Sequence, residues 1–173
     1  MRTNLVNVVI DDDQWIKIRG FKTWKASLGK LYKASMNEAL DSQMDSSANL
    51  LLTNDERICK LNLSFRNNNR PTNILSFPQF ETNDLKLLLV GKIDTTSKIN
   101  EIVIGDIAMS YETIARESNM FSVKFFDRCS HLFVHGMLHL LGMEHEDPLR
   151  AEEMERTEIK VLESFGLKNP YFL

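Results

Sequence analysis

The histidines of this chain lie in one short segment, and their spacing suits a metal ion. All four, His131, His135, His139 and His145, fall within positions 131–145. On a helix, His135 and His139 are at i and i+4, so both rings stand on one face. Gly142 can end that helix in the left-handed conformation at low steric cost, which lets His145 turn back towards the same point. Three neutral imidazoles leave one coordination position open for water, as in catalytic zinc sites.

The pattern predicts one tightly bound divalent ion per chain. We expect Zn²⁺ rather than Mg²⁺, because imidazole nitrogen suits zinc and magnesium prefers oxygen. Such an ion lowers the pKa of bound water to about 7 and supplies hydroxide at neutral pH. His131 extends the histidine face by one turn, and we interpret it as a residue that packs beside or supports the ligands His135, His139 and His145.

The spacing H-x3-H-x2-G-x2-H is also that of the metzincin zinc peptidases, with one element missing. The general-base glutamate of those enzymes follows the first histidine, and that position is Gly136 here. Without a carboxylate at this position, the usual activation of water for peptide hydrolysis is lost.

Apolar and β-branched runs alternate along the chain with stretches of helical period. We expect strands over Leu5–Ile10, Asn49–Leu52, Thr72–Phe80 and Ile102–Met109. We expect helices over about Trp15–Leu40, Ser110–Ser118, Phe125–Leu141 and Leu149–Phe165. A further helix should begin at a cap, Thr53 or Asn54, and run to Arg66. We expect a loop or short hairpin over Glu81–Glu101. This order lacks regular βαβ alternation and favours the α+β class. The helix over Phe125–Leu141 is apolar nearly all round, so it should be central and buried, with its histidine face in a cleft.

The composition is that of one globular domain spanning residues 1–173. Hydrophobic residues make up 43% and charged residues 26%, which excludes disordered and fibrous classes. A formal net charge of -3 excludes a protein held to nucleic acid by global charge alone. The chain shows no signal peptide, no apolar run long enough for a membrane span, and two cysteines without C-x-x-C spacing. We therefore expect a cytoplasmic protein with no membrane partner.

Four elements of the sequence, taken together, resemble one family. HGMLHLLGMEH (His135–His145) resembles the HGxLHLxGxDH signature of the YbeY family, the bacterial rRNA maturation RNases. LNLSFRNNNRPTNILSFP (Leu61–Pro78) resembles the family's LNxxYR…PTDVLSFP element, and IGDIAMS (Ile104–Ser110) resembles its LGDIxIS strand. AEEMERTEIKVLESFGL (Ala151–Leu167) is similar to its C-terminal helix. The elements occur in the family's order and cover most of the chain.

The resemblance implies a metal-dependent, single-strand-specific endoribonuclease for 16S rRNA 3′-end maturation and ribosome quality control, with the ribosome or its proteins as partners. It implies a zincin-like α+β fold, in which a central helix packs on a mixed four-stranded sheet with further helices around it. It makes the three signature histidines zinc ligands and places the family's functional arginine at Arg66. A metal-dependent peptidase-like hydrolase and a non-catalytic ribosome-assembly factor with a structural zinc are the alternatives. Gly136 argues against the first, and the open coordination position argues weakly against the second.

Several further residues are candidates for the site. Apart from the resemblance, the Arg66 guanidinium could clamp two oxygens of a phosphodiester in its charged transition state. Glu144, where the family usually has aspartate, could orient a ligand histidine or handle a proton. Asn73 replaces the family's usual aspartate and removes a charge beside the cleft. Ser76 and Asp106 are candidates for lining the cleft or supporting its ligands.

A basic stretch is the candidate RNA-binding surface. Six basic residues and no acid lie between Gln14 and Asn37, with aromatic residues interleaved. We expect four of its lysines to bind RNA phosphates, namely Lys22, Lys25, Lys30 and Lys33. A solvated lysine face on an amphipathic helix is the other interpretation. Binding would weaken with salt, and charge reversal at Lys22 and Lys25 would flatten that dependence.

Overall fold

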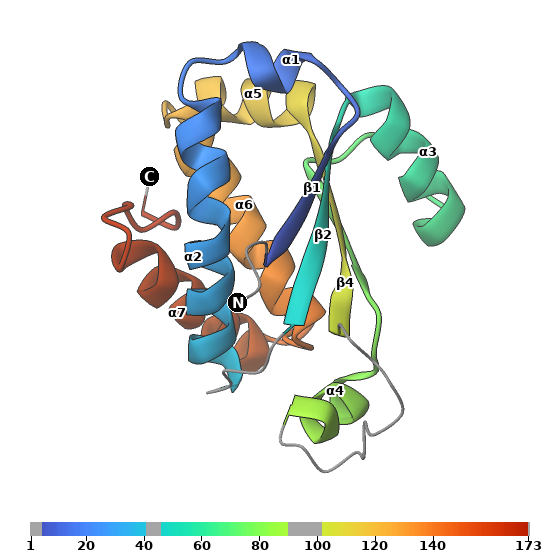
Figure 1. Ribbon diagram of the computed structural model, residues 1–173, viewed down its shortest axis with the longest axis vertical. Helices are drawn as coiled ribbons and strands as arrows, with labels where there is room; N and C mark the ends of the chain where they lie inside the picture. The colour runs from blue at the N-terminus through green and yellow to red at the C-terminus, as the bar shows by residue number, and fades with distance from the viewer. Residues whose placement is uncertain (1–4, 41–45, 90–101, 173) are drawn as a thin grey trace.

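The computed structural model describes residues 5–40, 46–89 and 102–172, which are built around a four-stranded sheet (Figure 1). The strands are β1 (Val6–Ile10), β2 (Ser46–Thr53), β3 (Ile74–Pro78) and β4 (Ile102–Ser110), in the spatial order β1-β2-β4-β3. β1, β2 and β4 run parallel, whereas β3 pairs antiparallel with β4 and forms one edge. The predicted α+β fold with a mixed four-stranded sheet is confirmed.

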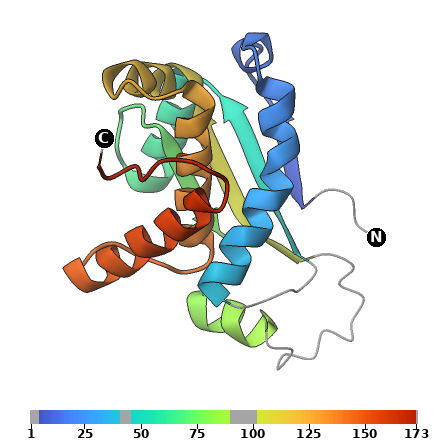
Figure 2. The ribbon, with the colours of Figure 1, turned by 90° about the vertical axis from the view of Figure 1, so that its left-hand side faces the viewer.

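Seven helices surround the sheet in the described ranges. They are α1 (Gln14–Lys17), α2 (Phe21–Leu40), α3 (Asp55–Arg66), α4 (Thr82–Leu89), α5 (Tyr111–Met120), α6 (Phe125–Leu140) and α7 (Pro148–Glu163). Figures 1 and 2 show α2, α6 and α7 on one side of the sheet and α3 on the other. α6 lies centrally, in contact with β3, β4, α2, α5 and α7. None of these described helices has the length and apolar character needed to cross a membrane.

Strand alternation gives the sheet two packed faces, because successive side chains point to opposite sides. On β4, Ile107 points towards α6 and joins the main core, where Phe133 and Leu138 of that helix are fully buried. The neighbouring Ala108 points the other way and forms a smaller core with Ile58 of α3. The buried central helix expected over Phe125–Leu141 is therefore α6.

The predicted helix over Trp15–Leu40 is interrupted. Gly20 has a φ of +100°, which an α-helix cannot contain and which glycine adopts without steric cost. The break separates α1 from α2 and allows Trp15 to turn inward, where its indole Nε1 donates a hydrogen bond of 2.9 Å to the Thr53 carbonyl. Trp24 of α2 stacks on this indole at a centroid distance of 6.1 Å. The turn at Gly20 thus allows Trp15 to bind the end of β2 and to pack against Trp24, which holds α1 and α2 in place.

The prediction of a loop or short hairpin over Glu81–Glu101 is wrong in its first part, where α4 forms. The helix places Leu85 in the core, and the Leu85 amide donates to the Glu81 carbonyl at 2.9 Å. Tertiary burial of this leucine outweighs the polar character of its neighbours, which had suggested irregular structure. The rest of the predicted loop, residues 90–101, lies outside the described residues.

Candidate active site

Three histidines converge at the C-terminal end of α6. His135 and His139 lie one helical turn apart, with their Nε2 atoms 3.1 Å from each other, and the ring of His145 lies 5.0 Å from that of His139 by centroid. One ligand atom from each of the three lies within 4.8 Å of the others. This geometry allows the three imidazoles to share one metal ion, as the spacing predicts.

A tight turn after α6 brings His145 back to the other two. Gly142 has a φ of +83°, and its amide donates to the His139 carbonyl at 3.0 Å. The Met143 amide then donates to Leu138 at 3.0 Å, which closes the helix end. A Cβ on Gly142 would lie 2.5 Å from Thr82 of α4, so this position needs glycine for space as well as for conformation.

The tautomer of His135 is fixed by a buried carboxylate. Glu158 of α7 is fully buried, and its Oε1 lies 2.7 Å from Nδ1 of His135. Burial raises the pKa of Glu158, but hydrogen bonds from His131, His135 and Tyr171 outweigh burial and lower that pKa to about 2. A carboxylate only accepts hydrogen bonds, so Nδ1 of His135 carries the proton and its Nε2 lone pair faces His139.

His131 belongs to the same hydrogen-bonded chain. Its Nε2 lies 3.0 Å from the second oxygen of Glu158, and its Nδ1 lies 2.8 Å from Nη1 of Arg128. Arginine only donates, so Nδ1 accepts and Nε2 carries the proton that Glu158 receives. The structure thus places His131 beside the ligands and not among the three converging rings.

His139 is neutral at physiological pH. Burial lowers its pKa most, the neighbouring His135 and His145 lower it further, and the result is about 4. A neutral imidazole keeps the lone pair that a metal requires. The donor set therefore fits a borderline-soft ion such as zinc better than magnesium or calcium.

The three rings open into a cleft of about 560 Å³ between α6, the β3 edge and the C-terminal end of α3, which we call the histidine cleft. Arg66 and Ser76 line it from α3 and β3, and Glu144 lines it from the turn after α6. The Oε2 of Glu144 lies 3.6 Å from Nδ1 of His139. Three more of the predicted site residues, Arg66, Ser76 and Glu144, therefore line the same cleft as the three histidines.

The end of α3 directs Arg66 into the histidine cleft. Asn54 begins this helix by accepting the Arg57 amide at 3.0 Å, so of the two predicted caps it is Asn54 that acts. Asn67 ends the helix in the left-handed conformation with a φ of 53°. Asn62 donates to the Arg70 carbonyl at 2.7 Å and holds the turn that follows. Arg66 itself is exposed and, among the described residues, has no ion pair or hydrogen-bond partner for its guanidinium.

Asp106 lies outside the histidine cleft. Its side chain is on the face of the sheet opposite α6, where its carboxylate accepts from Asn49 at 2.7 Å. Asn49 in turn accepts from Asn7 at 3.1 Å, so these three side chains form a polar row across β4, β2 and β1. The structure therefore does not bring Asp106 together with the three converging histidines.

The predicted RNA-binding lysines also lie away from the histidine cleft. All four are exposed on α2, namely Lys22, Lys25, Lys30 and Lys33. α2 packs against β1, at the opposite edge of the sheet from β3. An RNA that touched both surfaces would have to extend from one edge of the sheet to the other.

Gly136 marks the closest approach of α6 to the sheet. A Cβ at this position would lie 2.8 Å from Ile74 Cδ1 and 3.0 Å from Ser76 Oγ. A side chain at the position of the metzincin glutamate would thus be crowded by the side chains of Ile74 and Ser76 on β3 and of Ile107 on β4.

Sequence reasoning missed Glu158, which lies among many acids in the last helix. Its position held a usable signal, because Met154, Glu158 and Leu162 recur at four-residue intervals and all three are buried. A carboxylate in an apolar helical stripe needs buried hydrogen-bond donors, and here histidines supply them.

Comparison with known proteins gives one consistent family. The family model described as Endoribonuclease YbeY matches residues 10–166. A curated relative named Endoribonuclease YbeY from Bartonella bacilliformis is 35% identical over 168 residues, which cover 96% of this chain and 96% of the relative. A relative of the same name from Sphingopyxis alaskensis is 44% identical over 120 residues, 69% of this chain and 68% of the relative.

A solved structure shares the fold. The solution structure of TM1509 from Thermotoga maritima matches with a TM-score of 0.54 and 20% sequence identity, over 93% of this chain and 91% of that chain. At this level of identity the match supports the fold alone.

Proposed function

The chain belongs to the YbeY endoribonuclease family, and we propose that it hydrolyses phosphodiester bonds of single-stranded RNA in the histidine cleft. The proposed cofactor is one zinc ion per chain, held by His135, His139 and His145. The proposed substrate is 16S rRNA, cleaved in the cytoplasm during 3′-end maturation and ribosome quality control, with the ribosome or its proteins as partners.

The observation that carries this proposal is that a three-imidazole ligand set and an unpaired guanidinium open into one cleft. When bound, a divalent ion acts as a Lewis acid and supplies a water-derived nucleophile at neutral pH. The chain contributes neutral ligands, because the pKa of His139 is low and Glu158 fixes the tautomer of His135.

Arg66 is suited to bind the phosphate that reacts. Its guanidinium faces the cleft without a competing carboxylate partner in the described parts of the chain, so its donors are available to a substrate. A planar guanidinium can donate to two phosphate oxygens at once, and these contacts strengthen as negative charge builds up on them. Glu144 also lines the cleft, and its carboxylate lies 3.6 Å from His139, where it could accept a proton.

Peptide hydrolysis by the metzincin route is disfavoured by packing. The position after the first histidine is Gly136, which carries no carboxylate, and a side chain there would be crowded by Ile74 and Ser76. Phosphodiester cleavage needs charge stabilisation at the phosphate, and Arg66 provides this without a base at position 136.

The experiment combines metal analysis with RNA cleavage. The purified chain and His139→Ala are analysed for bound metals and then incubated with single-stranded and duplex RNA, with and without a chelator. We expect one equivalent of zinc in the wild type and cleavage of the single strand that the chelator abolishes. His139→Ala should lose both the zinc and the cleavage.

The outcomes separate the alternatives. Absence of a stoichiometric transition metal, with no thermal shift on adding zinc, would contradict the metal site. Zinc with RNA binding but no cleavage would favour the non-catalytic assembly factor. Cleavage of a peptide substrate by the wild type, lost in His139→Ala, would favour the peptidase.

A further inference from the structure

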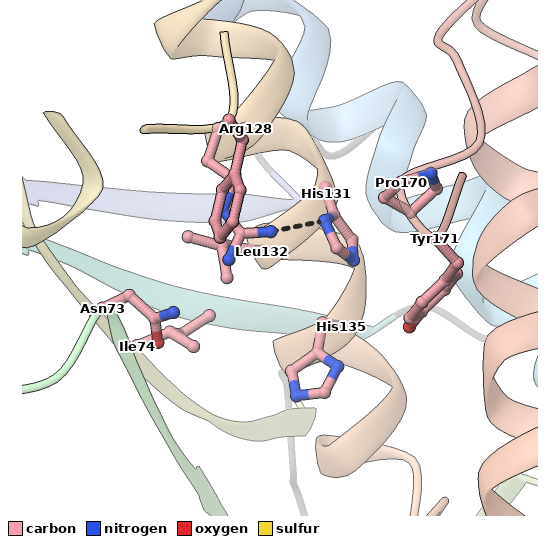
Figure 3. A pocket seen from close by; sticks show the side chains of 9 residues that line it. Asn73, Ile74, Arg128, His131, Leu132, His135, Pro170 and Tyr171 are labelled. Atoms are coloured by element: carbon pink, nitrogen blue, oxygen red, sulfur yellow. Dashed lines mark hydrogen bonds between the residues drawn. The ribbon is translucent and has the colours of Figure 1, made fainter. Parts of the chain in front are cut away.

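A second cavity lies directly beside the histidine cleft. It has a volume of about 400 Å³. It shares Asn73, Ile74 and His135 with the histidine cleft, so these three residues form the boundary between the two cavities. Figure 3 shows Arg128, His131 and His135 on one wall, Asn73 and Ile74 opposite, and Tyr171 on the third side. We call it the Arg128 cavity. Its volume lies in the range of pockets that hold small organic groups.

One wall of the Arg128 cavity is aromatic and rigidly held. The Phe121 ring is 46% exposed, and the Arg128 guanidinium lies over it at 5.6 Å from the ring centroid. Arg128 is fixed in turn, because its Nε and Nη2 donate to Glu117 at 3.0 and 2.8 Å. Its charge is paired with Glu117, and its third nitrogen contacts His131, so none of its nitrogens is free to bind an anion. What Arg128 presents to the cavity is the flat face of its guanidinium. Tyr171, 41% exposed, adds a second aromatic ring.

Asn73 supplies one hydrogen-bond acceptor of known direction. Its Nδ2 donates to both oxygens of Glu117, at 2.9 and 3.2 Å. A carboxylate cannot donate to the amide oxygen, so the orientation of the amide is settled and Oδ1 points away from Glu117. No described residue donates to this oxygen, and Asn73 lines the Arg128 cavity where it joins the histidine cleft, so we take the oxygen as free to accept from a molecule bound there.

We propose that the Arg128 cavity binds the base of a nucleotide adjacent to the scissile phosphate, by stacking on the flat surface that Arg128 and Phe121 form together and by a hydrogen bond to Oδ1 of Asn73. This proposal rests on the proposed RNA cleavage. Aromatic side chains and arginine planes are the surfaces on which unpaired bases stack. The Asn73 oxygen accepts from an exocyclic amino group, so cytosine is bound better than uracil, which presents a carbonyl oxygen at the same place.

The test measures binding and cleavage of short single-stranded RNA by the whole chain. Binding is followed by fluorescence anisotropy in the presence of chelator, so that the RNA is not consumed. Phe121→Ala should weaken binding about 5- to 150-fold, whereas Phe121→Tyr should keep most of the affinity. Met120→Ala is the matched control, since this side chain, on the last residue of α5 and next to Phe121, is exposed and does not line the cavity.

Base preference tests the second contact. Wild-type protein should prefer oligocytidylate over oligouridylate by about 2- to 10-fold, and Asn73→Ala should lose that preference. Zinc content must stay at the wild-type level in both variants, which separates a lost base contact from a damaged metal site.

Two results would overturn the proposal in distinguishable ways. If the wild type cleaves RNA and Phe121→Ala matches Met120→Ala in affinity and in kcat/KM, the Arg128 cavity does not bind a base. If the wild type neither binds nor cleaves RNA, the base site and the proposed function fail together.

Discussion

Glu158 Oε1 accepts a hydrogen bond of 2.7 Å from Nδ1 of His135, although the two residues lie on different helices. The other oxygen accepts from His131 at 3.0 Å and from the Tyr171 hydroxyl at 2.5 Å. One buried carboxylate thus orients a proposed metal ligand and ties the C-terminal segment to α6. Such supporting contacts commonly set metal affinity as strongly as ligand geometry does.

Replacing Glu158 should therefore weaken metal binding without removing a ligand. We expect Glu158→Gln to lower zinc affinity about 10- to 100-fold, because the amide cannot accept from two histidines and a tyrosine at once. Competition with a chromophoric chelator measures the affinity. Glu153→Gln, an exposed change on the same helix, is the control and should bind zinc like the wild type.

Arg66→Ala should reduce RNA cleavage while leaving the zinc in place. Loss of one such transition-state contact costs about 10²- to 10³-fold in rate. Arg66→Lys should recover only part of it, since an ammonium cannot donate to two oxygens in the geometry of a guanidinium. Steady-state kinetics and elemental analysis on the same samples check both statements. Full activity in a folded, zinc-loaded Arg66→Ala protein would contradict the role assigned to this arginine.

A pair of glycine substitutions tests the close contact of α6 with the sheet. Both Gly136 and Gly29 lie within helices, but a Cβ on Gly29 meets nothing within 4 Å. Both alanine variants gain helix propensity, and only Gly136→Ala is crowded against Ile74 and Ser76. We expect Gly136→Ala to have a free energy of unfolding about 1–3 kcal/mol below that of Gly29→Ala in urea denaturation. Equal stabilities would show that the sheet moves aside easily.

Acid should remove a stabilising contribution from Asp55. Its carboxylate accepts from Ser110 at 2.5 Å and from Thr113 at 2.6 Å, and pairs with Arg116 at 2.9 Å. Burial raises the pKa of Asp55, but these contacts outweigh burial and hold the pKa below its ordinary value. The folded state therefore favours the ionised form of Asp55. Its contribution to the free energy of unfolding is fully present above the ordinary carboxyl pKa near 4, and it is lost as the pH falls through the lower pKa of the folded protein.

The corresponding measurement compares wild type with Asp55→Asn in urea at pH 7 and near pH 3. The difference in unfolding free energy between the two proteins should be largest at pH 7 and should shrink at the lower pH. A difference that does not change with pH would mean that the carboxylate acts through shape alone.

The convergence of the three histidines could be predicted because their arrangement is local. His135 and His139 share a helix face by periodicity, and the left-handed Gly142 returns His145 to them, so no long-range contact is needed to bring the three together. The strands and most helices were predictable for a similar reason, since apolar periodicity and turn residues report the local backbone.

The remaining features depend on which distant surfaces meet. Asp106 and Ile107 are neighbours on β4, and only the packing of α6 decides that Ile107 faces the core and Asp106 the open side of the sheet. The same holds for Glu158, whose role depends on the docking of α7 beside α6. The break at Gly20 was missed because the periodic apolar positions lie after it, and the helix was extended back over a short segment with one buried residue, Trp15.

The three proposed ligands come from a single helix end and the turn that follows it. An ion bound there closes a loop of only a few residues, so it removes little of the conformational entropy of the unfolded chain. Such an ion would therefore not cross-link distant segments of the chain, as a structural zinc between two remote segments does. Chelation should therefore loosen the cleft while leaving the core cooperative.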